Sequence, residues 1–487
     1  MVSNSPSRPP AVGHEPVREL QVPPVKWCSV TLSDVLSRGN RLEASVFDLE
    51  AKQARTMIEC GKYPVVAVCG ETGLASAYTR GRFKRIWVEE SDYPIYQPST
   101  ILDIKPTPDG YISPRTKVDI DALRVRKGQL LMTCSGTIGK VAYVSDTLDT
   151  LIFSHDLLRI NCKDSCDAGY LYTYFKTAVG SKILTTNQYG AVISHIEAEH
   201  LAEVPVPNAP RSVKESIHER IVQSYSLRDA SNLLLEQAEQ KLVDALALPD
   251  LKTWRGTSAC VRPFQVRLSQ LSGRADASYH VPVVDAIIDH LREYAEEVTT
   301  IGDTRISKAV ILPGRFKRVY VESGYGRVFI GGKQLGELDP CNKKYLSLVR
   351  HGNRITEQLE LHENMTLITC SGTIGKVALV GKQWEKWTAN QHIIRVVPAS
   401  EDIAGYLNVF LSSAYGRALI SRFTYGSVVD EIDDNHVRQI AIPLLKDHEV
   451  QKQINDLALA ANQKRYEAYC LEQEALRIMH EEVLFAK

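Results

Sequence analysis

A ten-residue segment, TCSGTIGKVA, occurs twice in this chain, at residues 133–142 and again at residues 369–378. A second segment, GRFKR, is also repeated, at residues 81–85 and 314–318. The offset between the copies is 233 residues for GRFKR and 236 residues for TCSGTIGKVA. Ordered matches at a nearly constant offset are the signature of an internal duplication, in which each copy folds into the same unit. The chain is therefore predicted to contain two tandem units of one fold.

Each unit has a β-rich part followed by a helical part. The first part is rich in Val, Ile, Tyr and Thr and is interrupted by Gly and Pro, as in short strands joined by turns. A long stretch with helical periodicity follows it. We predict an α+β fold with two tandem β-rich domains, each followed by a long helix. The predicted boundaries are a disordered Pro-rich arm at 1–26, a domain at 27–210, a helix at 211–250, a linker at 251–262, a second domain at 263–444 and a second helix at 445–487.

Both helical stretches carry apolar residues at the 3.5-residue spacing of coiled coils. Each stretch of ~37 residues would form a helix ~55 Å long. Such a seam needs a partner and the chain has two seams, so we predict that the helices pair as an antiparallel coiled coil with pseudo-twofold symmetry. Packing of each helix on its own domain alone is the alternative. The predicted seam residues are Leu227, Leu234, Leu242, Val450, Ile454, Leu457, Leu471 and Ile478.

The composition excludes several classes of protein. Lys and Arg together number 58, as do Asp and Glu, so binding of nucleic acid by overall charge alone is not expected. No apolar run is long enough to span a membrane, and we see no signal-peptide core near the N-terminus. The ten cysteines form no CxxC pair, so we expect no metal site. Free thiols fit a cytoplasmic protein, which is the predicted localisation.

The repeated Ser-Gly-Thr-Ile-Gly-Lys segment matches no nucleotide-binding motif. A P-loop would need Gly at position 134 and Ser or Thr at position 141, where the chain has Cys134 and Val141. The second copy departs at the same places, with Cys370 and Val377. Methyltransferase, hydrolase and zinc-protease motifs are also absent from the sequence, so we predict a binding protein and not an enzyme. The segment should form a tight turn between two strands, and contact of its exposed groups with a phosphate remains open.

These features together resemble the specificity (S) subunit of type I restriction–modification systems. The resemblance is carried by the two Ser-Gly-Thr-x-Gly turns with their following helices, and by FKRIWVE at 83–89 and FKRVYVE at 316–322. KKYLS at 343–347 and the Pro-ending strand before each helix also match. The resemblance covers nearly everything from residue 27 onward.

The resemblance implies that each β-rich domain is a target recognition domain that reads one half of a divided double-stranded DNA target. The paired helices would be the spacer. Two methyltransferase subunits are implied as partners, with motor-nuclease subunits as further partners, and no membrane is involved. S-adenosylmethionine is expected on the methyltransferase, whereas this chain would hold no cofactor and catalyse nothing.

Comparison of the two copies divides the candidate DNA-contacting residues into two groups. Segments identical in both copies cannot distinguish different half-sites, so they are predicted to contact phosphates or to be framework. Base reading is expected from the divergent stretches at about 86–127 and 319–364, where Arg or Lys suits guanine and Gln or Asn suits adenine. The phosphate or framework candidates are Arg80, Arg82, Lys84, Arg85, Ser135, Thr137, Lys140, Arg315, Lys317, Arg318, Ser371, Thr373 and Lys376. The base-reading candidates are Gln97, Arg115, Lys117, Arg327, Lys333, Gln334, Asn342 and Arg350.

Because the two stretches differ, we expect an asymmetric, bipartite target. Two other functions remain open from the sequence. The chain could be the specificity module of another methylation-linked phage-defence system. It could also be a coiled-coil scaffold with two protein-binding domains, which would bind no DNA in a sequence-dependent manner.

Overall fold

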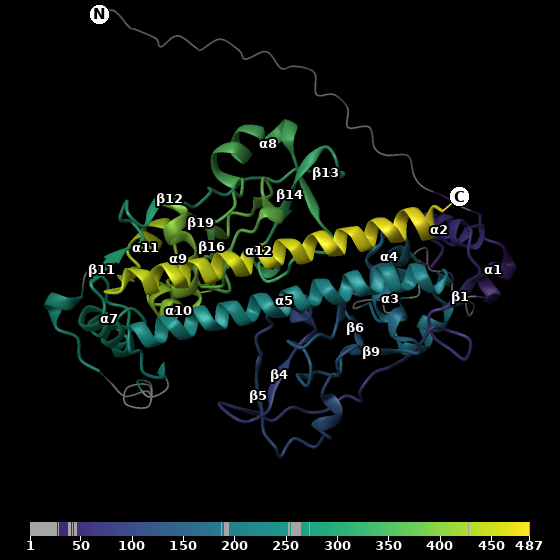
Figure 1. Cartoon of the computed structure of the whole chain (residues 1–487), viewed down its shortest axis with the longest axis horizontal. Coiled ribbons are helices and arrows are strands. Elements are labelled where there is room, and N and C mark those ends of the chain that lie inside the picture. Colours follow the sequence, from purple (N-terminus) through teal and green to yellow (C-terminus); the bar gives the residue numbers. More distant parts are fainter. Residues whose placement is uncertain are drawn as a thin grey trace, which may run out of the picture.

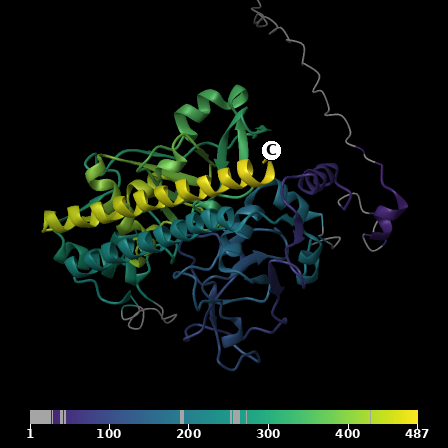
Figure 2. The same cartoon turned by 45° about the vertical axis from the view of Figure 1, so that its right-hand side comes forward.

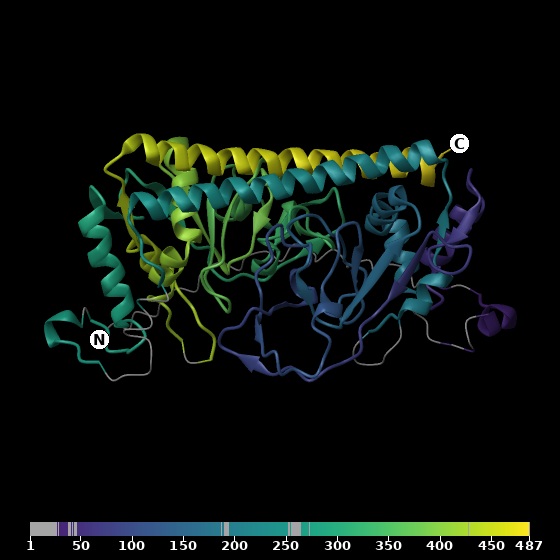
Figure 3. The same ribbon diagram turned by 60° about the horizontal axis from the view of Figure 1, so that its bottom comes forward.

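A computed structural model describes residues 27, 29–37, 40, 42, 46–186, 188, 194–251, 254, 264–271, 273–426 and 428–486. Two long helices, α5 (Arg211–Ala245) and α12 (His448–Ile478), lie side by side (Figure 1, Figure 2). Two globular units lie on one side of this helix pair (Figure 3). The elements between residues 46 and 207 form head 1, and those between residues 273 and 444 form head 2. The predicted arm at 1–26 and most of the predicted linker at 251–262 lie outside the described residues.

The central sheet of head 1 has the strand order β2-β9-β6-β7, and all its neighbours are antiparallel. An outer sheet has the order β3-β5-β4-β8, in which β4 and β8 are parallel. Strands β1 and β10 form a separate antiparallel pair. The strands are β1 (Val65–Ala67), β2 (Ala75–Tyr78), β3 (Trp87–Val88), β4 (Pro94–Tyr96), β5 (Gly110–Ile112), β6 (Leu130–Thr133), β7 (Val141–Tyr143), β8 (Ile152–Phe153), β9 (Leu157–Cys162) and β10 (Pro205–Pro207). The helices are α1 (Leu32–Ser37), which precedes the head, α2 (Leu49–Glu59), α3 (Ser165–Lys176) and α4 (Ala178–Thr185).

Head 2 repeats this topology strand for strand. Its central sheet has the order β12-β19-β16-β17, its outer sheet the order β13-β15-β14-β18, and β11 pairs with β20. The duplication predicted from the repeated segments is therefore confirmed in the fold. The strands are β11 (Glu297–Thr300), β12 (Ser307–Ile311), β13 (Tyr320–Val321), β14 (Gly326–Ile330), β15 (Lys344–Ser347), β16 (Thr366–Thr369), β17 (Val377–Leu379), β18 (Thr388–Ala389), β19 (Ile393–Pro398) and β20 (Ala441–Leu444). The helices are α7 (Pro282–Tyr294), α8 (Leu348–Arg354), α9 (Glu401–Ser412), α10 (Ala414–Ser421) and α11 (Asp434–Arg438).

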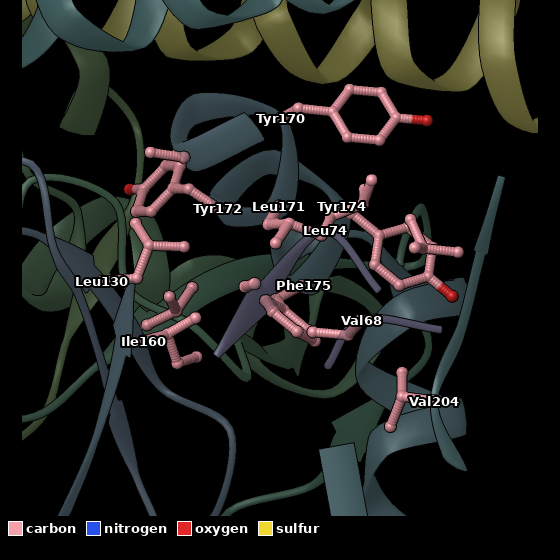
Figure 4. Close-up of a cluster of buried hydrophobic side chains, with 14 of the residues drawn as sticks. Val68, Leu74, Leu130, Ile160, Tyr170, Leu171, Tyr172, Tyr174, Phe175 and Val204 are labelled. Atoms are coloured by element: carbon pink, nitrogen blue, oxygen red, sulfur yellow. The ribbon is translucent and has the colours of Figure 1, made fainter. Parts of the chain in front are cut away.

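The core of head 1 lies between its central sheet and α3. Leu130 and Ile160 from the sheet lie near Leu171 and Phe175 of α3 in the same apolar cluster (Figure 4). All four side chains are at most 1% exposed. Complete burial of side chains of this size contributes roughly 1.5–3 kcal/mol each, so this layer supports the strands that lead to the repeated turn.

Both heads hold their buried helix to the final strand in the same way. In head 1 the Tyr170 hydroxyl of α3 donates to the Pro207 carbonyl of β10 over 2.5 Å. In head 2 the Tyr406 hydroxyl of α9 donates to the Pro443 carbonyl of β20 over 2.6 Å. A buried phenol needs such a partner, and the equivalent bonds fix the strand that precedes each long helix to the buried helix of its own head.

The two long helices run antiparallel. The Ser224 hydroxyl of α5 donates to the Ala468 carbonyl of α12 over 2.7 Å. Further along α5, Lys241 Nζ donates to Gln453 Oε1 over 2.9 Å. Residue numbers therefore rise on one helix as they fall on the other, as predicted. Knobs-into-holes geometry of the coiled-coil type stays a prediction.

Each long helix begins at its own head and ends in the core of the other head. The end of α12 and the π-helical turn after it belong to the apolar core of head 1 through Ala475, Ile478, Met479, Val483 and Leu484. The end of α5 and the residues after it belong to the core of head 2 through Ala238, Leu242, Leu246 and Leu248. The helices are thus shared between the heads and are integral to both cores.

The fully buried positions of the helix pair keep the predicted 3.5-residue spacing, but polar residues occupy its centre. Of the predicted seam residues, Leu242, Ile454 and Ile478 are buried, whereas Leu227, Leu234, Val450, Leu457 and Leu471 are only half-buried. Arg228 and Glu472 are buried in place of their neighbours Leu227 and Leu471. The buried residues of α5 include Ile217, Ile221, Ser224, Arg228, Ser231, Ala238 and Leu242. Those of α12 include Ile454, Ala458, Ala461, Ala468, Glu472 and Ala475.

Candidate nucleic-acid interface

A basic segment precedes the first strand of the outer sheet in both heads. In head 1, Arg82 and Lys84 are exposed and Arg85 is half-buried. In head 2, the matching Arg315 and Lys317 are exposed and Arg318 is half-buried. Exposed cations on a segment without regular secondary structure suit contact with DNA phosphates. Arg315 also forms an ion pair with Glu431 at 3.2 Å, so its charge is partly compensated.

Exposed aromatic side chains follow each basic segment. Trp87 on β3 is 50% exposed and Tyr320 on β13 is 42% exposed. The Arg85 guanidinium lies 5.9 Å from the Trp87 ring, and Lys344 Nζ lies 5.3 Å from the Tyr320 ring. Arg80 likewise stacks over a ring, that of Tyr78. Cations interleaved with aromatic faces are a surface suited to nucleic acid.

The repeated Ser-Gly-Thr-Ile-Gly-Lys segment forms a hairpin turn in each head, between β6 and β7 in head 1 and between β16 and β17 in head 2. Gly136 and Gly139 have φ values of 69° and 84°, and the two equivalent glycines of head 2 have φ values of 77° and 80°. These conformations favour glycine. Thr137 and Thr373 are exposed and Ser135 and Ser371 are half-buried. Their contact with a phosphate stays a prediction.

The two lysines that end these turns contact the opposite head. Lys140 Nζ of head 1 lies 3.3 Å from Glu337 Oε1 of head 2. Lys376 Nζ of head 2 lies 3.1 Å from Asp103 Oδ2 of head 1. Both lysines were candidates for phosphate contact or framework, and the structure places their ammonium groups against carboxylates at the junction of the heads.

The predicted base-reading residues do not gather at one place. Arg115, Lys117 and Asn342 are exposed on loops, Lys333 is exposed on a 3-10 helical turn and Arg350 on α8, whereas Gln97, Arg327 and Gln334 are half-buried. Gln334 Oε1 accepts from the Gly331 amide over 3.0 Å and so supports its own turn. Contact of these residues with bases stays a prediction.

Two further pairs of residues lie beside the basic segments, and the sequence reasoning missed them. His155 and Asp156 precede β9 in head 1, and Gln391 and His392 occupy the matching positions before β19 in head 2. The His155 ring lies 5.8 Å from the Phe83 ring, in edge-to-face contact. Aligning SHDLLRI with NQHIIRV at the 236-residue offset would have shown these differences next to conserved neighbours.

The arginines of the basic segments act electrostatically on the histidine of each pair. Burial lowers the pKa of His155, and the charges of Arg85 and Arg82 lower it further, although Asp156 opposes them. His155 Nδ1 is buried and has no hydrogen-bond partner among the described residues.

In head 2 the equivalent pair is bonded to its arginine. Gln391 Oε1 accepts from Arg318 Nη2 over 2.7 Å, and Gln391 Nε2 lies 3.1 Å from His392 Nε2. Burial lowers the pKa of His392, as do the charges of Arg318 and Arg315. The two heads therefore present different polar side chains against equivalent cations.

Comparison with known protein families matches the type I restriction modification DNA specificity domain, at residues 84–239 and 324–457. The two ranges cover more than half of the chain, with one range in each copy. The chain belongs to this family. As a type I specificity subunit it recognises DNA in a sequence-specific manner. No curated protein matches the chain.

Solved structures of type I specificity subunits are similar to this one at low identity. The S subunit of the type I restriction–modification system from M. genitalium is 13% identical, with 87% of this chain and 95% of that chain covered and a TM-score of 0.33. The HsdS subunit from Thermoanaerobacter tengcongensis is 13% identical, with 85% and 96% covered and a TM-score of 0.27. A chain from a structural study of complex assembly and conformational transition of the type I R-M system is 14% identical, with 86% and 98% covered and a TM-score of 0.26.

The described part of this specificity subunit contains neither a membrane-spanning helix nor a cluster of metal-binding side chains. None of its helices combines the length and the apolar character needed to cross a bilayer. No group of three or more His, Cys, Asp or Glu side chains in the same residues is arranged to hold a metal ion.

Proposed function

We propose that this specificity subunit reads an asymmetric, two-part DNA target, with one part read by each head. The observation that carries the proposal is that the heads share a strand order and a basic segment but differ in the polar side chains beside it. A shared frame positions both heads on the phosphates, and different side chains select different bases.

The helix pair supports a fixed separation between the two parts. Helix α5 has 35 residues and is therefore ~52 Å long. Half-sites read from one face of DNA lie about one helical turn apart, ~34 Å. Two heads on one side of a rod of this length can occupy such sites (Figure 3).

The subunit is proposed to act without catalysing a reaction itself, in a cytoplasmic complex with two methyltransferase subunits and with motor-nuclease subunits as further partners. S-adenosylmethionine would be bound by the methyltransferase. The zero net charge supports such a complex, because a chain without excess positive charge would share the contacts to DNA phosphates with its partners.

Co-expression with the cognate methyltransferase, followed by methylome sequencing, tests the proposal. The expected result is methylation at a bipartite motif with unequal halves and one spacer length. A continuous or palindromic motif, or methylation that depends on this chain but not on DNA sequence, would contradict it.

A further inference from the structure

The two heads touch each other directly beneath the helix pair. The amide of Ile104 in head 1 donates to the Gly336 carbonyl of head 2 over 2.8 Å, and Asp103 and Glu337 form an antiparallel bridge. A Cβ at position 336 would lie 2.4 Å from Asp103 Cγ. A side chain at position 336 would therefore displace the Asp103 carboxylate, so glycine leaves the room that this carboxylate occupies.

Two ion pairs cross this contact in opposite directions. The Lys140–Glu337 and Lys376–Asp103 pairs use the lysine of the repeated turn in one head and a carboxylate in the other. The Glu337 and Asp103 side chains are only 4% and 9% exposed. Each head thus contributes the same turn lysine and an equivalent acidic residue, so the contact is reciprocal.

The helix pair holds both sides of this contact. Asn232 Nδ2 of α5 donates to the Ile104 carbonyl over 3.0 Å. Gln473 Nε2 of α12 donates to Asp339 Oδ2 over 3.2 Å, two residues beyond Glu337. The contact is therefore continuous with the centre of the helix pair.

The buried carboxylates depend on their lysines. Burial raises the pKa of Asp103 and of Glu337, and the lysine charges oppose that shift. Removing one partner of a buried pair leaves an uncompensated charge, whereas exchanging the two charges keeps the pair neutral. Such pairs are better suited to fixing one geometry than to adding stability.

We propose that the Lys140–Glu337 and Lys376–Asp103 pairs set the separation and rotation of the two heads. Given the two-part target proposed above, they also determine the length of unread DNA between its parts. The helix pair joins the cores of the two heads, and the reciprocal contact adds a second, direct connection between them. In this role both lysines are positioning residues, and neither contacts a base.

A charge exchange tests this role. The variants are Lys140→Glu, Glu337→Lys and the double variant, with Lys140→Met as a milder form that keeps the apolar stem of the side chain. The complex of each variant with the cognate methyltransferase is assayed on DNA that keeps both parts of the wild-type target and varies the spacer one base pair at a time. Lys140→Glu should lower methylation at the native spacer roughly tenfold relative to neighbouring spacers, and the double variant should restore the preference.

Three outcomes would overturn the proposal. One is an unchanged spacer preference in Lys140→Glu and Lys140→Met. Another is a uniform loss of binding at all spacers that the double variant does not restore, with a reduced salt dependence, because that identifies a phosphate contact. The third is a change in the bases recognised within a half-site, because that identifies a base contact.

Small-angle X-ray scattering of the chain alone gives a readout that needs no DNA. The single variants should have a larger radius of gyration than the wild type, and the double variant should return to the wild-type value. If the wild-type complex methylates no two-part motif, the proposed function fails, and the scattering result still decides whether these pairs hold the heads. Equal scattering of all variants would refute the contact as a determinant of head position.

Discussion

Glu472 of α12 forms an ion pair with Arg228 of α5 in the centre of the helix pair, and the side chains are only 1% and 9% exposed. Lys176 at the end of α3 contacts the same carboxylate, and the Tyr172 hydroxyl donates to it over 3.1 Å. Head 1 and both long helices therefore meet at one buried negative charge. Polar groups at buried seam positions specify register, because any shift leaves them unpaired.

The first prediction concerns the stability of this cluster. Glu472→Gln should lower the free energy of unfolding by ~3–5 kcal/mol, because Arg228 and Lys176 would remain buried without a countercharge. Urea denaturation followed by circular dichroism measures the change. Glu474→Gln is the matched control on the same helix, since its pairs with Arg220 and Arg477 are partly exposed and the substitution should cost much less stability. Equal effects of the two substitutions would contradict the assigned role of Glu472.

The second prediction concerns pH. The charges of Lys176 and Arg228 lower the pKa of Glu472 to about 2 despite its burial. A lowered pKa in the folded state means that the stabilisation is complete above the unfolded value of about 4.5 and is lost as the pH falls towards 2. The difference in melting temperature between wild type and Glu472→Gln should therefore be largest near pH 6 and should shrink below about pH 4.5. A difference that stays constant down to pH 2.5 would refute this pairing.

The third prediction concerns the basic segment of head 1. Replacing Lys84 and Arg85 by Ala should weaken binding to all DNA sequences and should lower the slope of log K against log salt by about 2, or 0.9 per phosphate contact. Titrations of specific and random duplexes at several salt concentrations measure both effects. Arg292→Ala on α7, whose exposed side chain pairs with Asp289, is the control and should change neither. Loss of binding to the specific duplex alone would show that the segment reads bases.

The fourth prediction concerns the pairs beside the basic segments. The double variant His155→Gln with Asp156→His gives head 1 the side chains that head 2 has at the matching positions. Because the flanking arginines are equivalent, the exchange should change recognition only in the half of the target that head 1 reads. Methylome sequencing of cells that carry the variant complex measures this, with the unaltered second half as the internal control. An unchanged motif would exclude these residues from base selection.

The duplication made the architecture predictable from the sequence. The contacts between the two copies could not be predicted in this way. TCSGTIGKVA marks a buried strand, a glycine turn and a second strand, and these are the elements that β6 and β7 form. Lys140 was recognised as part of that segment, but its partner Glu337 lies 197 residues away in the other copy. No local pattern indicates which acidic residue a turn lysine will meet across a domain junction.

The period of the helix seam was predicted correctly, but several of the predicted seam residues lie one position before the buried ones. Apolar spacing favoured Leu227 and Leu471, and the buried neighbours are Arg228 and Glu472. Apolar periodicity cannot indicate these positions, because charged side chains are rarely buried unless they are paired. The pairing between Arg228 and Glu472 becomes visible only once both helices are in place.

The exchange of helix ends between the heads has a consequence for biosynthesis. Met479 and Leu484 fill the core of the head whose sheets are made of residues 65–207. A ribosome that has finished those sheets still has to synthesise more than half of the chain before these side chains become available. During translation the core of head 1 therefore stays incompletely filled until α12 and the turn after it have been synthesised.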